Sequence, residues 1–298
     1  MIALFNPEHD LCLANGSAHF VPPQSALRFA DEGASLMGIL YPEAVCIPAS
    51  QAGEAYQRLG EQERMEIIPW GWNLALKTTL LKQGIPSRLL PSDEYLASLR
   101  RLQHRTTLLP LQPQSHAATS PQEVEAILGR CADVVMKAPW SGAGRGLRWV
   151  SDRLSEHDRL WLLKVVREQG CVIVEPRRKV LADFALEYRV VRGILHFVGF
   201  SLFASLNGVY QYNLLLSDEE IVRRVDFDDA ERRRLEDWLQ EHIAPHYEGP
   251  LGIDYLHTSE GNCLSELNLR HTMGLLAHEY LRQHPAAQGT AFSPSALQ

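Results

Sequence analysis

The sequence predicts a mixed fold in which a small α/β unit with a parallel sheet precedes an α+β region. Two patterns predict it. In the first hundred residues, short apolar runs alternate with helical stretches, an order that favours parallel strands with helices packed on them. After residue 184, apolar stretches follow one another across an Arg192-Gly193 turn, which favours antiparallel strands. With 298 residues, 45% of them hydrophobic, the chain can bury several packed units.

The first hundred residues hold short buried strands separated by helices. The expected strands span residues 2–5, 44–47 and 65–68, and the expected helices span 51–64 and 74–83. Gly84 follows the second helix, as glycine commonly does at a helix end. The polar stretch 112–121 predicts a linker. A helix at 122–130 comes next, with Ser120 as its N-cap and Pro121 at its first position.

Beyond this linker, strands outnumber helices. The expected strands span 133–138, 147–150, 171–174, 184–191, 194–203, 252–256 and 262–267, and the expected helices span 155–169, 229–243 and 271–284. We expect residues 286–298 to be frayed, as chain ends commonly are.

Composition excludes several functional classes. Lys and Arg total 29 against 36 Asp and Glu, and the resulting net charge of −7 argues against nucleic-acid binding, which depends on phosphate neutralisation. No apolar run approaches the roughly 20 residues that cross a bilayer, and the first residues lack the pattern of a signal peptide. The five cysteines are widely spaced and form no CxxC, which is typical of reduced thiols. We therefore expect a cytoplasmic protein without nucleic-acid or membrane partners.

A glycine-rich loop, Ser141-Gly142-Ala143-Gly144-Arg145-Gly146, follows the strand that carries Lys137. It is not a Walker A loop, because no Lys-Ser or Lys-Thr follows, and not a Rossmann fingerprint, because the next element is a strand. A third interpretation is a loop between antiparallel strands whose N–H groups cover phosphates, with Lys137 supplying a positive charge. An ordinary glycine-rich turn remains the alternative.

Two carboxylates and an amide lie close together near the C-terminus. Glu266 and Asn268 are two apart on an expected strand, so they point to the same face. If the two last strands form a hairpin, Asp254 joins them from the neighbouring strand. Such a set of oxygen ligands suits Mg²⁺ bound to nucleotide phosphates. The alternative, which is favoured for any one carboxylate taken alone, is a residue on an edge strand that faces water. Arg270 continues the series and indicates an anion at this place.

In this order along the chain, these motifs resemble the ATP-grasp superfamily. They are Lys137 with the glycine loop, Val172-Ile-Val-Glu-Pro176, Gly-Ile-Asp254 and Glu266-Leu-Asn268-Leu-Arg270, and the resemblance covers residues 105–280. It implies that ATP is clamped between two α+β subdomains. The implied domains are a preceding α/β domain at 1–104, a lid subdomain at 105–176 and a C-terminal subdomain with the metal site at 177–298.

The resemblance also implies a role for each matching residue. Lys137 and Arg105 would contact ATP phosphates, although Lys is commoner than Arg at the position of Arg105. The loop 141–146 would be the lid, with Arg145 as an added contact to phosphate or substrate. Glu175 matches the hinge position that recognises the adenine.

The remaining matches lie on the C-terminal subdomain. Glu187 resembles the acidic residue that holds the ribose hydroxyls, and Asp183 is its rival because Glu187 is far from Glu175 in sequence. The Mg²⁺ ligands would be Asp254, Glu266 and Asn268. Arg270 matches the residue that steadies the transferring phosphoryl group or the tetrahedral intermediate, so Arg270 and Lys137 are the expected catalytic residues.

The function predicted from this resemblance is an ATP- and Mg²⁺-dependent ligase, with Mn²⁺ as a substitute metal. It would activate a small carboxylate as an acyl phosphate and let an amine displace the phosphate. The alternatives are an ATP-dependent small-molecule kinase and a non-catalytic nucleotide-binding module. A homodimer is compatible with the family.

Two polar segments near the N-terminus have no role in this prediction. Asn6, Glu8 and His9 follow the first strand, where they would either line a substrate pocket or form a capped turn. The segment Trp70-Gly-Trp-Asn73 is similarly placed, and its tryptophans are expected in the core.

Overall fold

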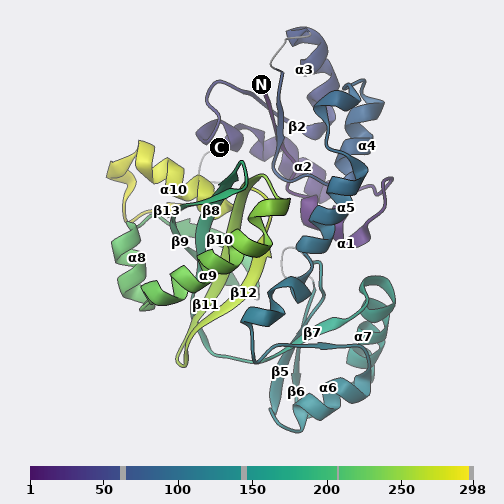
Figure 1. The fold of residues 1–298 in the computed structure, drawn as a ribbon, viewed down its shortest axis with the longest axis vertical. Helices are drawn as coiled ribbons and strands as arrows, with labels where there is room; N and C mark the ends of the chain where they lie inside the picture. The colour runs from purple at the N-terminus through teal and green to yellow at the C-terminus, as the bar shows by residue number, and fades with distance from the viewer. Residues whose placement is uncertain (61–64, 142–145, 207, 295–298) are drawn as a thin grey trace.

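The computed structural model describes residues 1–60, 65–141, 146–206 and 208–294. They form three sheets, ordered β2-β1-β3, β4-β7-β5-β6 and β12-β11-β8-β9-β10-β13. In Figure 1 the N-terminal sheet and its helices lie above, and the other two sheets lie below it, beside one another. No helix of the described part is long and apolar enough to cross a membrane.

The first sheet is parallel, as the alternation of strands and helices predicts. Its strands are β1 (Ile2–Phe5), β2 (Val45–Pro48) and β3 (Ile67–Pro69). The helices of this unit are α1 (His9–Asn15), α2 (Gln24–Gly33), α3 (Ala52–Leu59), α4 (Leu74–Lys82) and α5 (Asp93–Leu102), with short 3-10 turns at Ala34–Ile39, Ala49–Gln51 and Ser87–Leu89. All four residues of β1 are fully buried, because a central parallel strand covered on both faces must be apolar throughout.

The second sheet is antiparallel and flanks the glycine-rich loop. It consists of β4 (His116–Ala118), β5 (Asp133–Lys137), β6 (Leu147–Ser151) and β7 (Val172–Pro176), with helices α6 (Pro121–Leu128) and α7 (Glu156–Gln169). β5 pairs with β6 directly across the loop, as predicted. Ser120 accepts a hydrogen bond from the Glu123 N–H, and Pro121 is the first residue of α6, as expected.

The expected linker at 112–121 is wrong in part. A 3-10 helix, Arg105–Leu111, precedes it, and residues 116–118 form β4, which pairs with β7 along the sheet edge. The strand is only three residues long, and His116 and Ala117 are exposed, so it lacks the alternation by which a strand is recognised in sequence.

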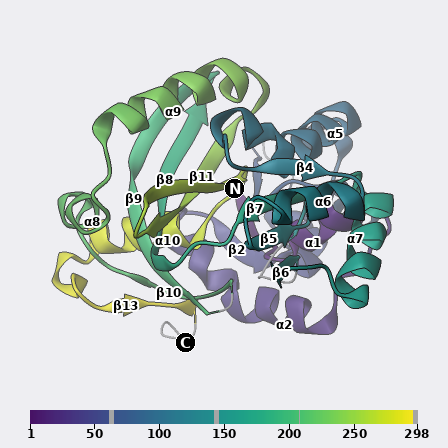
Figure 2. The same cartoon turned by 90° about the horizontal axis from the view of Figure 1, so that it is seen from below.

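The third sheet is the largest. It contains β8 (Val180–Val191), β9 (Ile194–Leu206), β10 (Val209–Leu214), β11 (Gly249–Thr258), β12 (Gly261–Asn268) and β13 (Ala291–Phe292). α8 (Asp218–Val225) and α9 (Asp229–His242) pack on one face, and α10 (Met273–Gln283) packs against the other, as Figure 2 shows for α9 and α10. Short 3-10 turns lie at Ala244–His246 and Pro285–Ala287.

The end of the chain is not frayed as far as the structure describes it. Asn213 of β10 pairs with Phe292 of β13, and Phe292 is only 2% exposed against Tyr280. A two-residue strand gives no periodic signal, so the sequence could not predict it. All five cysteines are free thiols, as their spacing predicts.

The second sheet has an apolar core of its own, whereas the first and third sheets share apolar clusters. The cluster under the second sheet contains only side chains from residues 118–174. In contrast, β1 and Trp70 share a cluster with Leu276 of α10, and Leu99 of α5 joins the core under the third sheet. The N-terminal unit and the third sheet are therefore joined by shared apolar cores.

Candidate active site

A cavity of about 730 Å³ lies between the second and third sheets. The predicted site residues that line it are Arg105, Lys137, Ser141, Glu175, Asp183, Glu187, Asp254, Glu266, Asn268 and Arg270. Gly146 does not line it, and Gly142, Ala143, Gly144 and Arg145 lie outside the described residues. The predicted residues that line the cavity thus come together from the second sheet, the third sheet and the segments next to them, such as the 3-10 helix that Arg105 begins.

The floor of the cavity is one face of the third sheet. Asp183, Ala185 and Glu187 alternate along β8, so all three point to this face. Ala185 lies opposite Asp254 on β11, and its small side chain leaves space above the strand. The intervening residues of β8, among them Leu186, point into the apolar core beneath.

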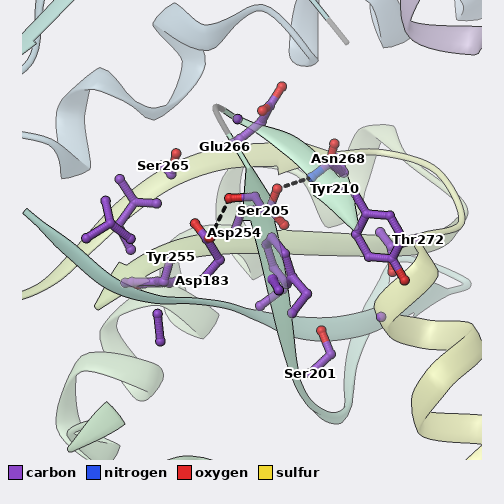
Figure 3. A pocket seen from close by; sticks show the side chains of 18 of the residues that line it. Asp183, Ser201, Ser205, Tyr210, Asp254, Tyr255, Ser265, Glu266, Asn268 and Thr272 are labelled. Carbon is purple, nitrogen blue, oxygen red and sulfur yellow. Dashed lines mark hydrogen bonds between the residues drawn. The ribbon is translucent and has the colours of Figure 1, made fainter. Parts of the chain in front are cut away.

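The expected hairpin brings the oxygen ligands together. Asp254 lies directly opposite Glu266 across β11 and β12, and Asn268 lies two residues further along. Figure 3 shows the hydrogen bond of 3.1 Å that the Asn268 amide donates to Asp254. A register shift after Asp254 also turns Ser265 toward the cavity beside Glu266, as bulges do when they redirect a side chain.

This donor set fits a divalent cation. Burial, and then the nearby carboxylates of Glu266 and Glu187, raise the pKa of Asp254 to about 8. A bound Mg²⁺ would neutralise this concentration of negative charge, and its preferred ligands are carboxylate and amide oxygens. Among the described residues, no cluster of three or more His, Cys, Asp or Glu is suited to a metal. The third metal ligand of this set must therefore be the side-chain oxygen of Asn268.

Two positively charged side chains on the opposite side of the cavity, Lys137 and Arg105, form ion pairs with glutamates. Lys137 Nζ lies 2.7 Å from Glu175 Oε2, and both side chains are buried. Lys137 also donates a hydrogen bond of 3.4 Å to Ser265, which connects the second sheet to the third. Lys137 and Glu175 can face the same cavity because Glu175 lies opposite Val135, two residues before Lys137 on β5.

Arg105 connects the start of the glycine-rich loop to the third sheet. Its Nη2 lies 2.7 Å from Glu266 Oε2, and its Nη1 donates to the Ala138 carbonyl at 2.5 Å and to Ser141 Oγ at 2.8 Å. The side chain is 8% exposed. Arginine has enough donors for all these contacts, whereas a lysine would offer one nitrogen only.

The two candidate ribose ligands have different surroundings. Glu187 is 1% exposed, and its two oxygens accept hydrogen bonds from Ser201 (2.9 Å) and Thr272 (2.7 Å). Burial raises the pKa of its carboxyl to about 7. Gly274 of α10 packs so closely that an added Cβ would lie 2.1 Å from Glu187 Oε1. Asp183 is less enclosed, and its hydrogen bonds come from one residue, Ser205, whose hydroxyl donates at 2.6 Å (Figure 3).

Arg270 has a partner that the sequence did not indicate. Its Nε and Nη2 donate to the two oxygens of Asp10 at 3.0 and 2.9 Å, and its Nη1 donates to the His271 carbonyl at 2.9 Å. Asp10 lies in the first turn of α1 and also lines the cavity. Its only signal in the sequence is its position just after the first strand, where ligands of parallel sheets collect.

Burial of the neutral His271 ring contributes stability that we expect to be lost as the pH drops from 6.5 to 4. This side chain is 2% exposed, contacts the Trp70 carbonyl through Nδ1 and the Tyr41 hydroxyl through Nε2, and burial lowers its pKa to about 4. The folded state therefore resists protonation that the unfolded chain accepts, so the contribution of His271 to stability is fully present above pH 6.5 and lost below it, by about 3 kcal/mol. Urea unfolding at several pH values should show a shallower acid loss for His271→Gln than for the wild type. Parallel losses in both proteins would contradict this assignment.

The sequence matches no protein-family model and no curated protein. Solved structures do match. N5-carboxyaminoimidazole ribonucleotide synthetase from Thermus thermophilus is 17% identical over 91% of this chain and 72% of that one, with a TM-score of 0.51. Pyruvate carboxylase from Rhizobium etli is 17% identical over 72% of this chain and 20% of that one, with a TM-score of 0.51. The biotin carboxylase domain of Hydrogenobacter thermophilus 2-oxoglutarate carboxylase is 12% identical over 78% of this chain and 56% of that one, with a TM-score of 0.50.

Proposed function

The chain has the ATP-grasp fold, and on this premise we propose that it is an ATP- and Mg²⁺-dependent ligase. It activates a small carboxylate as an acyl phosphate, which an amine then attacks to form an amide or peptide bond. The proposal keeps the three expected domains, 1–104, 105–176 and 177–298. The solved biotin carboxylase domain that resembles it is a complex with magnesium ADP and bicarbonate.

One observation carries the proposal. A single cavity has a metal-type oxygen set on one sheet and two buried cations, Arg105 and Lys137, reaching it from the opposite side. Magnesium ATP needs this combination, because its phosphates take cations and its metal takes carboxylates. A module without catalysis has no need for the complete set.

The order of residues along β8 supports one orientation of ATP. Asp183 lies near the start of the strand, two residues before Ala185, which is opposite Asp254. Glu187 lies level with Asn268 of the metal set, because both are opposite Gly252 on β11. With the adenine at Glu175, the ribose lies before the phosphates. Asp183 therefore suits the ribose better than Glu187, whose two oxygens are taken by Ser201 and Thr272.

The chemistry follows from charge. The substrate carboxylate attacks the terminal phosphorus of ATP, ADP leaves, and the amine then displaces phosphate from the acyl phosphate. Mg²⁺ bound at Asp254, Glu266 and Asn268 would neutralise phosphate charge. Lys137 and Arg105 hold the phosphates, and Arg270 faces the terminal phosphoryl group as its charge develops. Catalysis of this kind depends on positioning and electrostatic stabilisation and needs no covalent enzyme intermediate.

Trapping with hydroxylamine tests the proposal. The protein is incubated with magnesium ATP, hydroxylamine and each member of a panel of carboxylic acids, and both ADP and hydroxamate are measured. We expect at least one acid to give ADP and hydroxamate in equal amounts, because hydroxylamine intercepts an acyl phosphate. ADP release with a phosphorylated hydroxyl compound and no hydroxamate would instead identify a kinase. Magnesium-dependent ATP binding without any ADP release across the panel would favour the non-catalytic module.

A further inference from the structure

We propose that Asp10 is a positioning residue for Arg270, and that the two unassigned segments Asn6–Asp10 and Trp70–Asn73 hold this pair in place. The inference rests on the proposed role of Arg270 at the terminal phosphate. Asp10 acts through Arg270 and makes no contact with ATP of its own. Among the described residues before position 100, Asp10 is the one that lines the cavity.

The pairing fixes the guanidinium in one orientation. Both oxygens of Asp10 are used, one by Nε and one by Nη2 of Arg270, and Nη1 is held by the His271 carbonyl. A two-point contact between carboxylate and guanidinium restrains rotation that a single contact would leave free. Nη1 and Nη2 each carry a second hydrogen beyond these contacts, and Arg270 lines the cavity, so these hydrogens are available to an anionic oxygen there.

The Asp10 side of the pair is anchored through its neighbour, His9, which is fully buried. His9 Nε2 lies 3.2 Å from Gln103 Oε1, and its Nδ1 lies 3.2 Å from the Asn73 amide nitrogen. Gly71 packs on the ring so closely that an added Cβ would lie 2.6 Å from it. Packing and these two hydrogen bonds therefore fix the position of the His9 imidazole.

The backbone on both sides of Arg270 is held by Gln103 and Trp70. The amide of Gln103, which contacts His9, also donates to the Leu269 carbonyl at 3.3 Å. The His271 N–H donates to the Trp70 carbonyl at 2.9 Å. Both chain neighbours of Arg270 are thus tied to the groups that hold His9, because Gln103 contacts the His9 ring and Trp70 precedes Gly71, which packs on it. Asn6 completes the network, because its amide donates to the Gly71 carbonyl at 2.9 Å.

This arrangement explains why Asn6, His9 and Asn73 are buried at the end of the first sheet, whereas Glu8, whose Oε2 is buried without a hydrogen bond, is not part of it. Buried polar groups are costly unless all their hydrogen bonds are satisfied, and a satisfied network fixes a single geometry. Here the geometry that is fixed is that of one arginine in the cavity. The N-terminal unit therefore contributes to the site through the orientation of Arg270.

The test compares nucleotide discrimination in Asp10→Asn, Arg270→Gln and the double variant. Calorimetry measures the binding of ADP and of the β,γ-methylene analogue of ATP, both with Mg²⁺. We expect Arg270→Gln to lower the affinity ratio of the ATP analogue to ADP about tenfold, which corresponds to one charged hydrogen bond. Asp10→Asn should lower the same ratio to a similar extent with unchanged ADP affinity, and the double variant should be no worse than Arg270→Gln.

Asp229→Asn is the matched control. Asp229 on α9 also takes two hydrogen bonds from one arginine, Arg232, but it is exposed and does not line the cavity. This variant should keep the wild-type ratio, and thermal unfolding should show that all the variants fold.

Three results would overturn the inference while leaving the proposed function intact: an unchanged ratio in Asp10→Asn, equal losses for both nucleotides, or additive effects in the double variant. A wild-type protein that binds neither nucleotide would overturn the proposed function and the inference together.

Discussion

Asp254→Asn is expected to lower magnesium-dependent ADP release about 1000-fold while leaving the protein folded. The substitution keeps the shape of the side chain and removes one of the two charges that would hold the metal opposite Glu266. A loss of this size corresponds to about 4 kcal/mol of transition-state stabilisation, which is within the range for a lost charge contact at phosphoryl transfer. The measurement is ADP release with whichever acid supports it in the hydroxylamine assay.

Stability provides a second readout that does not depend on activity. The pKa of Asp254 is raised to about 8, so ionisation costs the folded state stability as the pH rises from the unfolded value toward 8. In metal-free buffer at pH 9, Asp254→Asn should therefore unfold at a higher temperature than the wild type. Added Mg²⁺ should raise the unfolding temperature of the wild type only.

Asp237→Asn, an exposed change of the same type on α9, is the control and should behave as the wild type. Full turnover in Asp254→Asn, together with equal magnesium stabilisation in both proteins, would exclude Asp254 as a metal ligand.

Lys137→Met is expected to destabilise the protein by about 3 kcal/mol and to abolish nucleotide binding. The substitution leaves the Glu175 carboxylate, which is 5% exposed, without its cation at 2.7 Å. Removing one member of a buried ion pair is strongly destabilising, because the remaining charge stays buried and unpaired. Urea unfolding measures the first effect and calorimetry with magnesium ATP the second.

A double variant separates the two effects. Lys137→Met with Glu175→Leu should recover most of the lost stability, since an apolar pair can replace a buried ion pair, yet it should still fail to bind ATP. Lys164→Met, an exposed lysine on α7, controls for the loss of a positive charge. If the double variant binds ATP as the wild type does, Lys137 has no role at the phosphates.

Much of the site could be predicted because it depends on local geometry. Asp254, Glu266 and Asn268 lie on one hairpin, and the period of two along a strand already places Glu266 and Asn268 on the same face. The antiparallel pair around the glycine-rich loop could be predicted for the same reason.

What the sequence could not predict depends on contacts between distant segments. The Asp10–Arg270 pair joins the first helix to the end of β12, and no periodic pattern reports such a contact. The edge strands β4 and β13 are too short to show alternation, and their existence depends on the strands that they join. The position of Ser265 depends on a register shift that the pattern of apolar residues does not reveal.

The separate apolar core of the second sheet has a mechanical consequence. In the part of the chain that the structure describes, this core shares no side chains with its neighbours, whereas the N-terminal unit and the third sheet share theirs. By their apolar cores, the described residues therefore form two bodies. The contacts of Arg105 and Lys137 across the cavity are polar, and Trp140 also packs against Arg100 and His104. Swinging the smaller body outward would expose little hydrocarbon besides the Trp140 ring, so opening should have a small heat capacity change and a weak dependence on urea. It should respond instead to ionic strength, which weakens the contacts between charges that hold the two bodies together.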